Sequence, residues 1–318
     1  MKIFITLFLL VTLASSCKED NPLKKDIADI DISVERFDRL LANTSIKDLA
    51  KLKQAYPFMF PKKYTDAFWE DRLTDTLQIE ILNEVEKTFP DFSGIEADIE
   101  TFFGYMHYYF PEFTPPRVIT AISDVDYRNK VIVTDTIALI SLDTYLGNDH
   151  RFYESIQKYI RQDLRKKQIV VDLATAYSEK YIFPKQKKTL LDEIVYYGKE
   201  LYFKDATLPF ITEEERISYT KAQLDWALAN ENYIWRYFVE RELLYSTDSK
   251  LPNRFINPAP FTKFNLAEID NDSPGRLGQY IGWQIVRAYM ENNDVSLKDM
   301  LIASPKEIFN KSRFKPRK

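Results

Sequence analysis

The sequence contains few of the residues on which many catalytic centres depend. It has one cysteine, Cys17, and two histidines, His107 and His150, among 318 residues. A single cysteine cannot close an internal disulfide, so its thiol is free, joined to another molecule or modified. The histidines are far apart and no H-E-x-x-H motif occurs, which excludes two imidazoles one helical turn apart, as zinc proteases have. We expect His107 to be a hydrogen-bonded packing residue and His150 to be exposed.

Other familiar catalytic motifs are missing too. The chain has no G-x-S-x-G elbow, no phosphate-binding loop and no cysteine–histidine pair. The sequence therefore predicts a protein that is not an enzyme, with no catalytic residues, no bound metal and no cofactor.

The chain also lacks a large excess of charge of either sign. Its 44 Lys and Arg residues nearly balance its 48 Asp and Glu residues, giving a net charge of -4 with the signs interspersed. This balance argues against a nucleic-acid partner. Only residues 311–318 are locally basic, and such a tail suits either a solvated end or contact with an anionic surface. With 45% hydrophobic and 14% aromatic residues, the composition is that of a core-forming protein.

The first residues differ from the rest of the chain and predict a lipoprotein signal peptide over residues 1–16. Lys2 is followed by an apolar run, Ile3–Leu13, that is too short for a stable membrane-spanning helix. Small residues then lead directly to Cys17. We expect Cys17 to become the lipid-carrying N-terminus, although the strictest lipobox has Leu where this chain has Ala14. The alternative is an ordinary cleavable signal with an incidental cysteine.

Lipidation at Cys17 would decide where the protein resides. Several acyl chains such as palmitate on one terminus anchor a protein stably, whereas a single chain holds it only reversibly. No later segment approaches the length and apolarity of a membrane span. We therefore expect residues 17–33 to form a lipid anchor and spacer, and residues 34–318 to form a single globular domain. The membrane, reached through the N-terminal lipid, is then a partner of this cell-envelope protein.

The pattern of apolar residues predicts an α+β fold that is predominantly helical. A small β-sheet is expected near residues 117–142, where short segments are rich in β-branched residues. Helical periodicity is found in the following stretches: 46–55, 65–88, 95–110, 152–167, 169–181, 189–203, 213–245 and 274–291.

Two of these helices contain glycine within an otherwise regular pattern. A glycine inside a helix is about 1 kcal/mol less favourable than alanine, so it usually marks close packing. Gly198 lies beside an apolar stripe, and Gly278 and Gly282 lie one turn apart. We expect these glycines to pack against other helices. Ser273 and Pro274 are suited to cap and begin the second of the two helices.

Several motifs resemble the GldB family of gliding motility lipoproteins from Bacteroidetes. They are Leu142–Gly147, Ile194–Tyr202, Trp235 with Leu243–Asp248, Ala259–Phe261 and, most specifically, Pro274–Arg287. The resemblance implies a non-catalytic cell-envelope lipoprotein that is required for gliding and linked to type IX secretion and to other gliding or envelope proteins.

The same resemblance gives a second meaning to the residues after the cysteine. Lys18, Glu19 and Asp20 resemble the Bacteroidetes signal for export of lipoproteins to the cell surface, which would place the protein at the outer membrane. The other interpretation of these charges is a solvated spacer. Whether the domain faces the periplasm or the outside stays open at this point.

A weaker resemblance is to gluzincin-like metalloproteases. In those proteins, the helix near 171–175 would hold H-E-x-x-H, but here Val171 and Thr175 stand in place of the histidines. Only Asp172 and Glu193 would remain, and two carboxylates make a poor zinc site. The resemblance implies a degenerate metalloprotease fold with Asp172 and Glu193 as a relic of a lost metal site. The alternative is that both are ordinary acids on helix surfaces.

Three functions are therefore compatible with the sequence. The first is a non-catalytic envelope lipoprotein needed for gliding. The second is a pseudoprotease-like module that binds a peptide or protein in a former cleft. The third is a metal-dependent hydrolase that uses carboxylates.

Overall fold

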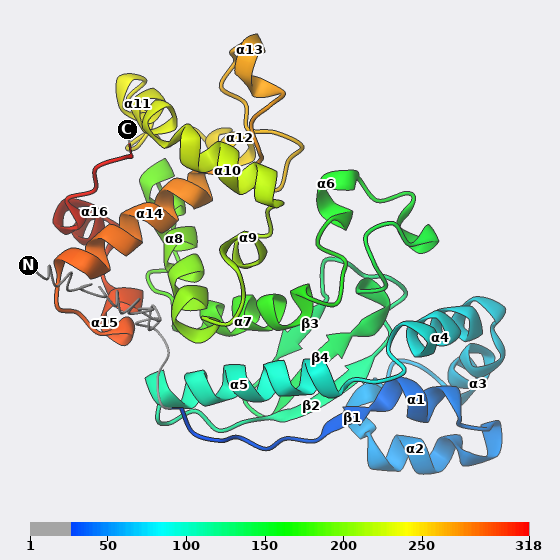
Figure 1. Ribbon diagram of the computed structural model, residues 1–318. Helices are drawn as coiled ribbons and strands as arrows, with labels where there is room; N and C mark the ends of the chain where they lie inside the picture. Colours follow the sequence, from blue (N-terminus) through cyan, green and yellow to red (C-terminus); the bar gives the residue numbers. More distant parts are fainter. Residues whose placement is uncertain (1–26, 318) are drawn as a thin grey trace, which may run out of the picture.

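A four-stranded mixed sheet lies at one side of the molecule in the computed structural model, which describes residues 27–317 (Figure 1). The strand order is β1-β2-β4-β3, with β1, β2 and β4 parallel and β3 antiparallel to β4. The strands are β1 (Val34–Arg36), β2 (Arg117–Ala121), β3 (Val131–Val133) and β4 (Ile137–Ser141). The sheet predicted near residues 117–142 is thus confirmed, and β1 joins it from a part of the chain that the pattern did not mark as a strand.

Helices make up most of the rest, which confirms the predicted α+β, predominantly helical class. They are α1 (Phe37–Ala42), α2 (Leu49–Ala55), α3 (Asp66–Thr74), α4 (Thr76–Thr88), α5 (Ser93–Tyr109), α6 (Lys158–Arg161), α7 (Gln168–Tyr181), α8 (Leu190–Thr207), α9 (Glu213–Arg216), α10 (Lys221–Ala229), α11 (Glu231–Glu240), α12 (Leu251–Phe255), α13 (Ala267–Asp270), α14 (Leu277–Asn292), α15 (Leu297–Ile302) and α16 (Pro305–Ser312). Among the helices formed by the described residues, none combines the length and apolar character that a bilayer-crossing segment requires.

Some predicted helices are interrupted, and capping explains one of these breaks. The stretch 65–88 divides at Asp75, whose side chain accepts a hydrogen bond from the backbone of Gln78 and so begins α4. The stretch 213–245 divides into α9, α10 and α11. The helix predicted over 152–167 is wrong, because this segment forms short turns and the four-residue helix α6.

Both faces of the sheet are covered, which is why its central strands are apolar on both sides. On β2, Val118 faces the main core, to which α5, α7, α8 and α14 contribute. The next residue, Ile119, packs with Phe37 and Leu49 in a smaller cluster formed with α1 and α2. Successive side chains of a strand point to opposite faces, so these two adjacent residues join the sheet to two separate groups of helices.

The centre of the helical part is the crossing of α8 and α14, and glycines make it possible. A Cβ on Gly282 would lie 1.8 Å from the carbonyl oxygen of Ile194, and one on Gly198 would lie 2.3 Å from that of Gly282. The two backbones therefore touch at Gly198 and Gly282. Gly278 is likewise closed in, by the backbone and side chain of Phe255. The predicted packing role of these glycines is confirmed.

The start of α14 differs from the prediction. Its N-cap is Arg276, which has φ +61°, rather than Ser273. The Ser273 hydroxyl instead donates to the backbone oxygens of Thr262 and Asp270 and fixes the loop before the helix. A residue with the side chain of a helix cap is here used to close a turn, which local sequence alone does not reveal.

Candidate functional site

Asp172, one of the two predicted relic residues, lies on α7 and is held by two neighbours. Lys130 Nζ on the approach to β3 lies 2.5 Å from its carboxylate, and the buried Tyr145 hydroxyl donates to it over 2.8 Å. Burial raises the pKa of Tyr145 well above its usual value, so this hydroxyl remains a donor at neutral pH. The carboxylate of Asp172 thus takes part in an ion pair and a hydrogen bond within the fold.

Beside this pair lies a carboxylate of a different kind. Burial raises the pKa of Asp163 to about 6, and nearby charges include those of Lys130 and Asp172. Its buried Oδ1 has no hydrogen-bond partner among the residues that the structure describes. Asp163 therefore carries an ionised group at neutral pH in surroundings that disfavour it.

Glu193, the second predicted relic residue, lies in the first turn of α8 and pairs with Lys187 at 3.0 Å. It also lines a surface pocket together with Lys187 and Ser246, and Asp172 is not among the residues that line that pocket. Asp172 and Glu193 have no described contact with each other, and each pairs with a different lysine. Within residues 27–317, no group of three or more His, Cys, Asp or Glu side chains is arranged to hold a metal ion.

Both histidines interact with neighbouring parts of the fold. His107 Nδ1 lies 3.2 Å from the carbonyl oxygen of Phe113, which agrees with the predicted hydrogen-bonded packing role. The prediction that His150 is exposed is wrong. Its side chain is only 14% exposed, lies 3.3 Å from Glu84 and accepts a hydrogen bond from the backbone of Phe152. A polar loop sequence suggested exposure, but the ring closes the loop against α4.

The densest group of buried charges lies where α8, α9 and α14 meet. Asp205, 3% exposed, accepts hydrogen bonds from the indole of Trp283 at 2.7 Å and from Arg287 at 2.7 and 3.0 Å. Arg216 Nη1 adds an ion pair at 2.8 Å, and Glu213 accepts from Arg287 at 2.8 Å. The guanidinium of Arg287 also lies over the Trp283 ring, 3.8 Å from its centre. Several partners therefore satisfy this buried carboxylate.

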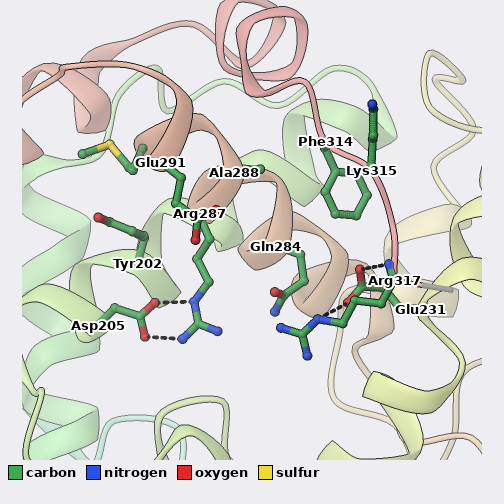
Figure 2. Close-up of a pocket in the computed structure, with 11 residues that line it drawn as sticks. Tyr202, Asp205, Glu231, Gln284, Arg287, Ala288, Glu291, Phe314, Lys315 and Arg317 are labelled. Carbon is green, nitrogen blue, oxygen red and sulfur yellow. Dashed lines mark hydrogen bonds and ion pairs between the residues drawn. The ribbon is translucent and has the colours of Figure 1, made fainter. Parts of the chain in front are cut away.

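This network forms one wall of a cavity of about 420 Å³ (Figure 2). Tyr202 and Asp205 from α8 face residues of α14, and segment 314–317 of the C-terminal tail closes the other side. Burial raises the pKa of Tyr202, so its phenol stays protonated at neutral pH. The volume is within the usual range for small-molecule sites. The residues from α14 that line the cavity are Gln284, Arg287, Ala288, Met290 and Glu291.

A second buried carboxylate, Glu231 at the start of α11, lies at the far side of the cavity. It is 2% exposed and accepts hydrogen bonds from the Tyr280 hydroxyl at 2.7 Å and from the backbone N–H of Arg317 at 2.9 Å. The Arg317 side chain lies near it, at 3.9 Å. Glu231 thus fastens the C-terminal tail to the helical core. The basic tail predicted to be solvated or surface-binding is therefore docked, at least as far as residue 317.

One motif singled out in the sequence, Pro274–Arg287, supplies part of this site: Gln284 and Arg287 line the cavity, and Trp283 belongs to the buried network. The motif indicated a packed helix, and it does form one, but the cavity on its polar side was not predicted. One signal for it was present: Gln284, Arg287 and Glu291 recur at helical spacing on one face of α14. The contributions of Glu231 and Arg317 depend on contacts between distant segments. Cys17 lies outside the described residues.

Comparison with protein families gives one clear relationship. The model for the family described as gliding motility protein GldB matches residues 20–316, and its label marks the family as one of lipoproteins. Searches of curated proteins and of solved structures gave no match. Because the family match spans nearly the whole chain, including α8 and α14, the protein belongs to the GldB family and takes part in gliding motility.

Proposed function

We propose that this protein is a lipid-anchored, non-catalytic component of the cell envelope that gliding requires, and that it acts with other gliding or type IX secretion proteins. The anchor is Cys17, carrying acyl chains such as palmitate, and the membrane is the outer membrane. The family match carries the proposal, because it joins a gliding role to a lipoprotein label over residues 20–316. The signal-like residues 1–16 and the small residues before Cys17 support the anchor.

The surroundings of Asp172 and Glu193 support a role without catalysis. Each carboxylate pairs with a lysine, at 2.5 Å for Lys130 and 3.0 Å for Lys187. Groups paired in this way stabilise local structure, and a general base needs a free lone pair within reach of its substrate. We therefore assign both residues to folding and the function of the domain to binding.

Deletion of the gene from a gliding host tests the proposed role. Colonies of the deletion strain should not spread, and expression of the wild-type gene should restore spreading. Complementation with a gene carrying Asp172→Asn and Glu193→Gln together should also restore it, because neither carboxylate is assigned to chemistry. Normal spreading of the deletion strain would refute the gliding role, and failure of the double variant despite normal protein levels would refute the non-catalytic assignment.

A second candidate function is a binding module for a peptide or another carboxylate-bearing molecule, and the cavity beside α14 favours it. Its location differs from that of the cleft that a metalloprotease ancestry would imply, because Asp172 and Glu193 do not line it. This function is compatible with the first one, since a lipid-anchored protein can contribute to gliding by holding a partner.

A further inference from the structure

We infer that the cavity between α8, α14 and the C-terminal tail is a binding site for a carboxylate group carried by an organic molecule, such as a small organic acid or the carboxyl end of a peptide. The inference rests on the proposed binding role and names its site and the chemistry of its ligand. Three donors, Gln284, Arg287 and Arg317, converge on the cavity from two separate segments of the chain (Figure 2).

Gln284 is the first of these donors. It is 7% exposed, and no hydrogen bond is found for its side-chain amide within the described residues. Figure 2 shows the amide directed into the cavity, between Arg287 and Arg317. Solvent reaches the amide atoms through the cavity, so the N–H groups of Gln284 are available to donate to a ligand there.

Arg287, one turn further along α14, is the second donor. Its Nε and Nη2 atoms bind Asp205, and Nη2 also binds Glu213, while no described hydrogen bond uses Nη1. In Figure 2, the third nitrogen of this guanidinium lies on the side away from Asp205, toward the cavity. Asp205 and the Trp283 ring fix the orientation of the guanidinium, so Nη1 is positioned before any ligand arrives.

Arg317 supplies the third donor from the opposite wall. Its backbone N–H binds Glu231, which places the side chain over the cavity, and Figure 2 shows the guanidinium on the same side as the Gln284 amide. Lys315 also lines the cavity, but its ammonium group points away. Two guanidinium groups that face one space repel each other, and an anion placed between them would remove that repulsion.

The charges behind these donors favour an anion of single charge. Asp205 and Glu213 already share the charge of Arg287, and Glu231 lies beside Arg317. Glu291 also lines the cavity, so the carboxylates offset the charges of the two guanidinium groups, and a phosphate dianion would be poorly compensated. The remaining lining includes apolar surface from Tyr202, Ala288, Met290 and Phe314, which suits the body of an organic molecule.

Binding of N-acetylphenylalanine to the full-length protein, purified with detergent, tests the inference. Titration followed by saturation-transfer NMR gives its dissociation constant, and N-acetylphenylalanine amide serves as the uncharged control. We expect the acid to bind about tenfold or more tightly than the amide, because only the acid forms charge-assisted hydrogen bonds. Acetyl-Ala-Ala-Ala-Phe separates the two sources of the carboxylate: tighter binding than the small acid indicates a peptide end, and equal binding indicates a small acid.

Two variants and one matched control locate the binding. Gln284→Leu and Arg317→Gln should each weaken binding of N-acetylphenylalanine about tenfold. Arg313→Gln should leave it unchanged, because Arg313 is an exposed residue of the same tail that does not line the cavity. Arg317 is also exposed, so its variant remains informative even if Gln284→Leu does not fold.

Three outcomes would overturn the inference. They are equal binding of the acid and the amide, binding that Arg317→Gln leaves unchanged, and displacement of the acid by lower concentrations of inorganic phosphate. Either of the first two outcomes would show that this cavity does not bind a carboxylate. The third would show that the cavity prefers a different anion. None of these measurements depends on gliding, so a failed gliding test and a failed binding test can be told apart.

Discussion

Two regions of this molecule contain buried or half-buried carboxylates, and they hold them differently. Around α14, Asp205 has hydrogen bonds or ion pairs with Trp283, Arg216 and Arg287, and it borders a cavity. Near α7, Asp172 is paired with Lys130, while the neighbouring Asp163 has a buried oxygen with no hydrogen-bond partner in residues 27–317. The comparison teaches that the organised polar site of this fold lies on α14, away from the position that a metalloprotease ancestry would suggest.

The largest effect should come from the helix crossing that supports the α14 region. Gly282→Val should reduce the free energy of unfolding by at least about 3 kcal/mol or prevent folding, because its Cβ would lie 1.8 Å from the Ile194 oxygen. Thermal or urea unfolding measures the loss. Gly94→Ala is the control: a Cβ on Gly94 meets nothing within 4 Å, so this helical substitution should be neutral or slightly stabilising. A stable Gly282→Val variant would show that the helices do not meet as described.

The second prediction concerns the buried carboxylate of the same region. Asp205→Ala should lower the free energy of unfolding by about 3–5 kcal/mol, because it leaves Arg216 and Arg287 buried with fewer partners. Glu213→Ala removes a 41% exposed partner of the same arginine and should lower it by less than about 1 kcal/mol. Urea unfolding measures both variants. If Asp205→Ala and Glu213→Ala lowered the free energy of unfolding equally, burial of the carboxylate would not explain how much each partner of Arg287 stabilises the fold.

The third prediction concerns the α7 region, where removal of a buried charge should raise the free energy of unfolding instead of lowering it. The pKa of Asp163 is raised to about 6 in the folded state, above its ordinary value of about 3.9 in an unfolded chain. Ionised Asp163 therefore destabilises the fold above pH 6, and the folded state gains stability relative to the unfolded state as pH falls from about 6 to 4. Asp163→Asn should stabilise the protein by on the order of 1 kcal/mol at pH 8, with the gain lost near pH 4.

Urea unfolding of both proteins across this pH range measures the difference directly. The raised pKa requires the stabilising effect of Asp163→Asn to shrink as the solution is acidified. A gain that stays constant from pH 8 to pH 4, or a loss at pH 8, would contradict the description of Asp163 as a destabilising buried charge.

The smallest effects should follow from neutralising the proposed relic. Asp172→Asn and Glu193→Gln should each lower the free energy of unfolding by about 1 kcal/mol or less, because each breaks one partly exposed ion pair. A double variant should show the sum of the two losses, since the residues have no described contact. If the loss in the double variant differed strongly from the sum of the single losses, Asp172 and Glu193 would share a site. The α7 region would then also contain an organised polar site, as the α14 region does.

The sequence contained enough information to predict the fold class and the packing helices, because periodicity and interior glycines are local features. It could not indicate that Gly198 meets Gly282, or that Val34–Arg36 pairs with a strand more than 80 residues away, since these contacts form only in the folded chain. Capping was also misjudged at Ser273, whose hydroxyl binds a distant backbone oxygen.

The candidate site was predicted less well than the fold. The resemblance to gluzincin-like metalloproteases drew attention to Asp172 and Glu193, but each of them pairs with a separate lysine. The cavity depends on Glu231 and Arg317, which are 86 residues apart and meet through a backbone hydrogen bond. Helical spacing places Gln284, Arg287 and Glu291 on one face of α14, but no local pattern in the tail indicated that residues 314–317 would lie opposite them.

Replacement of the anchor residue tests the central claim most directly. In a gliding host that lacks the chromosomal gene, we compare wild-type protein with Cys17→Ala by cell fractionation and colony spreading. The account predicts that wild-type protein is found with membranes and restores spreading, whereas Cys17→Ala is unlipidated, is found in the soluble fraction and does not restore spreading. Cys17→Ala protein that remains with the membranes and restores full spreading would contradict the account.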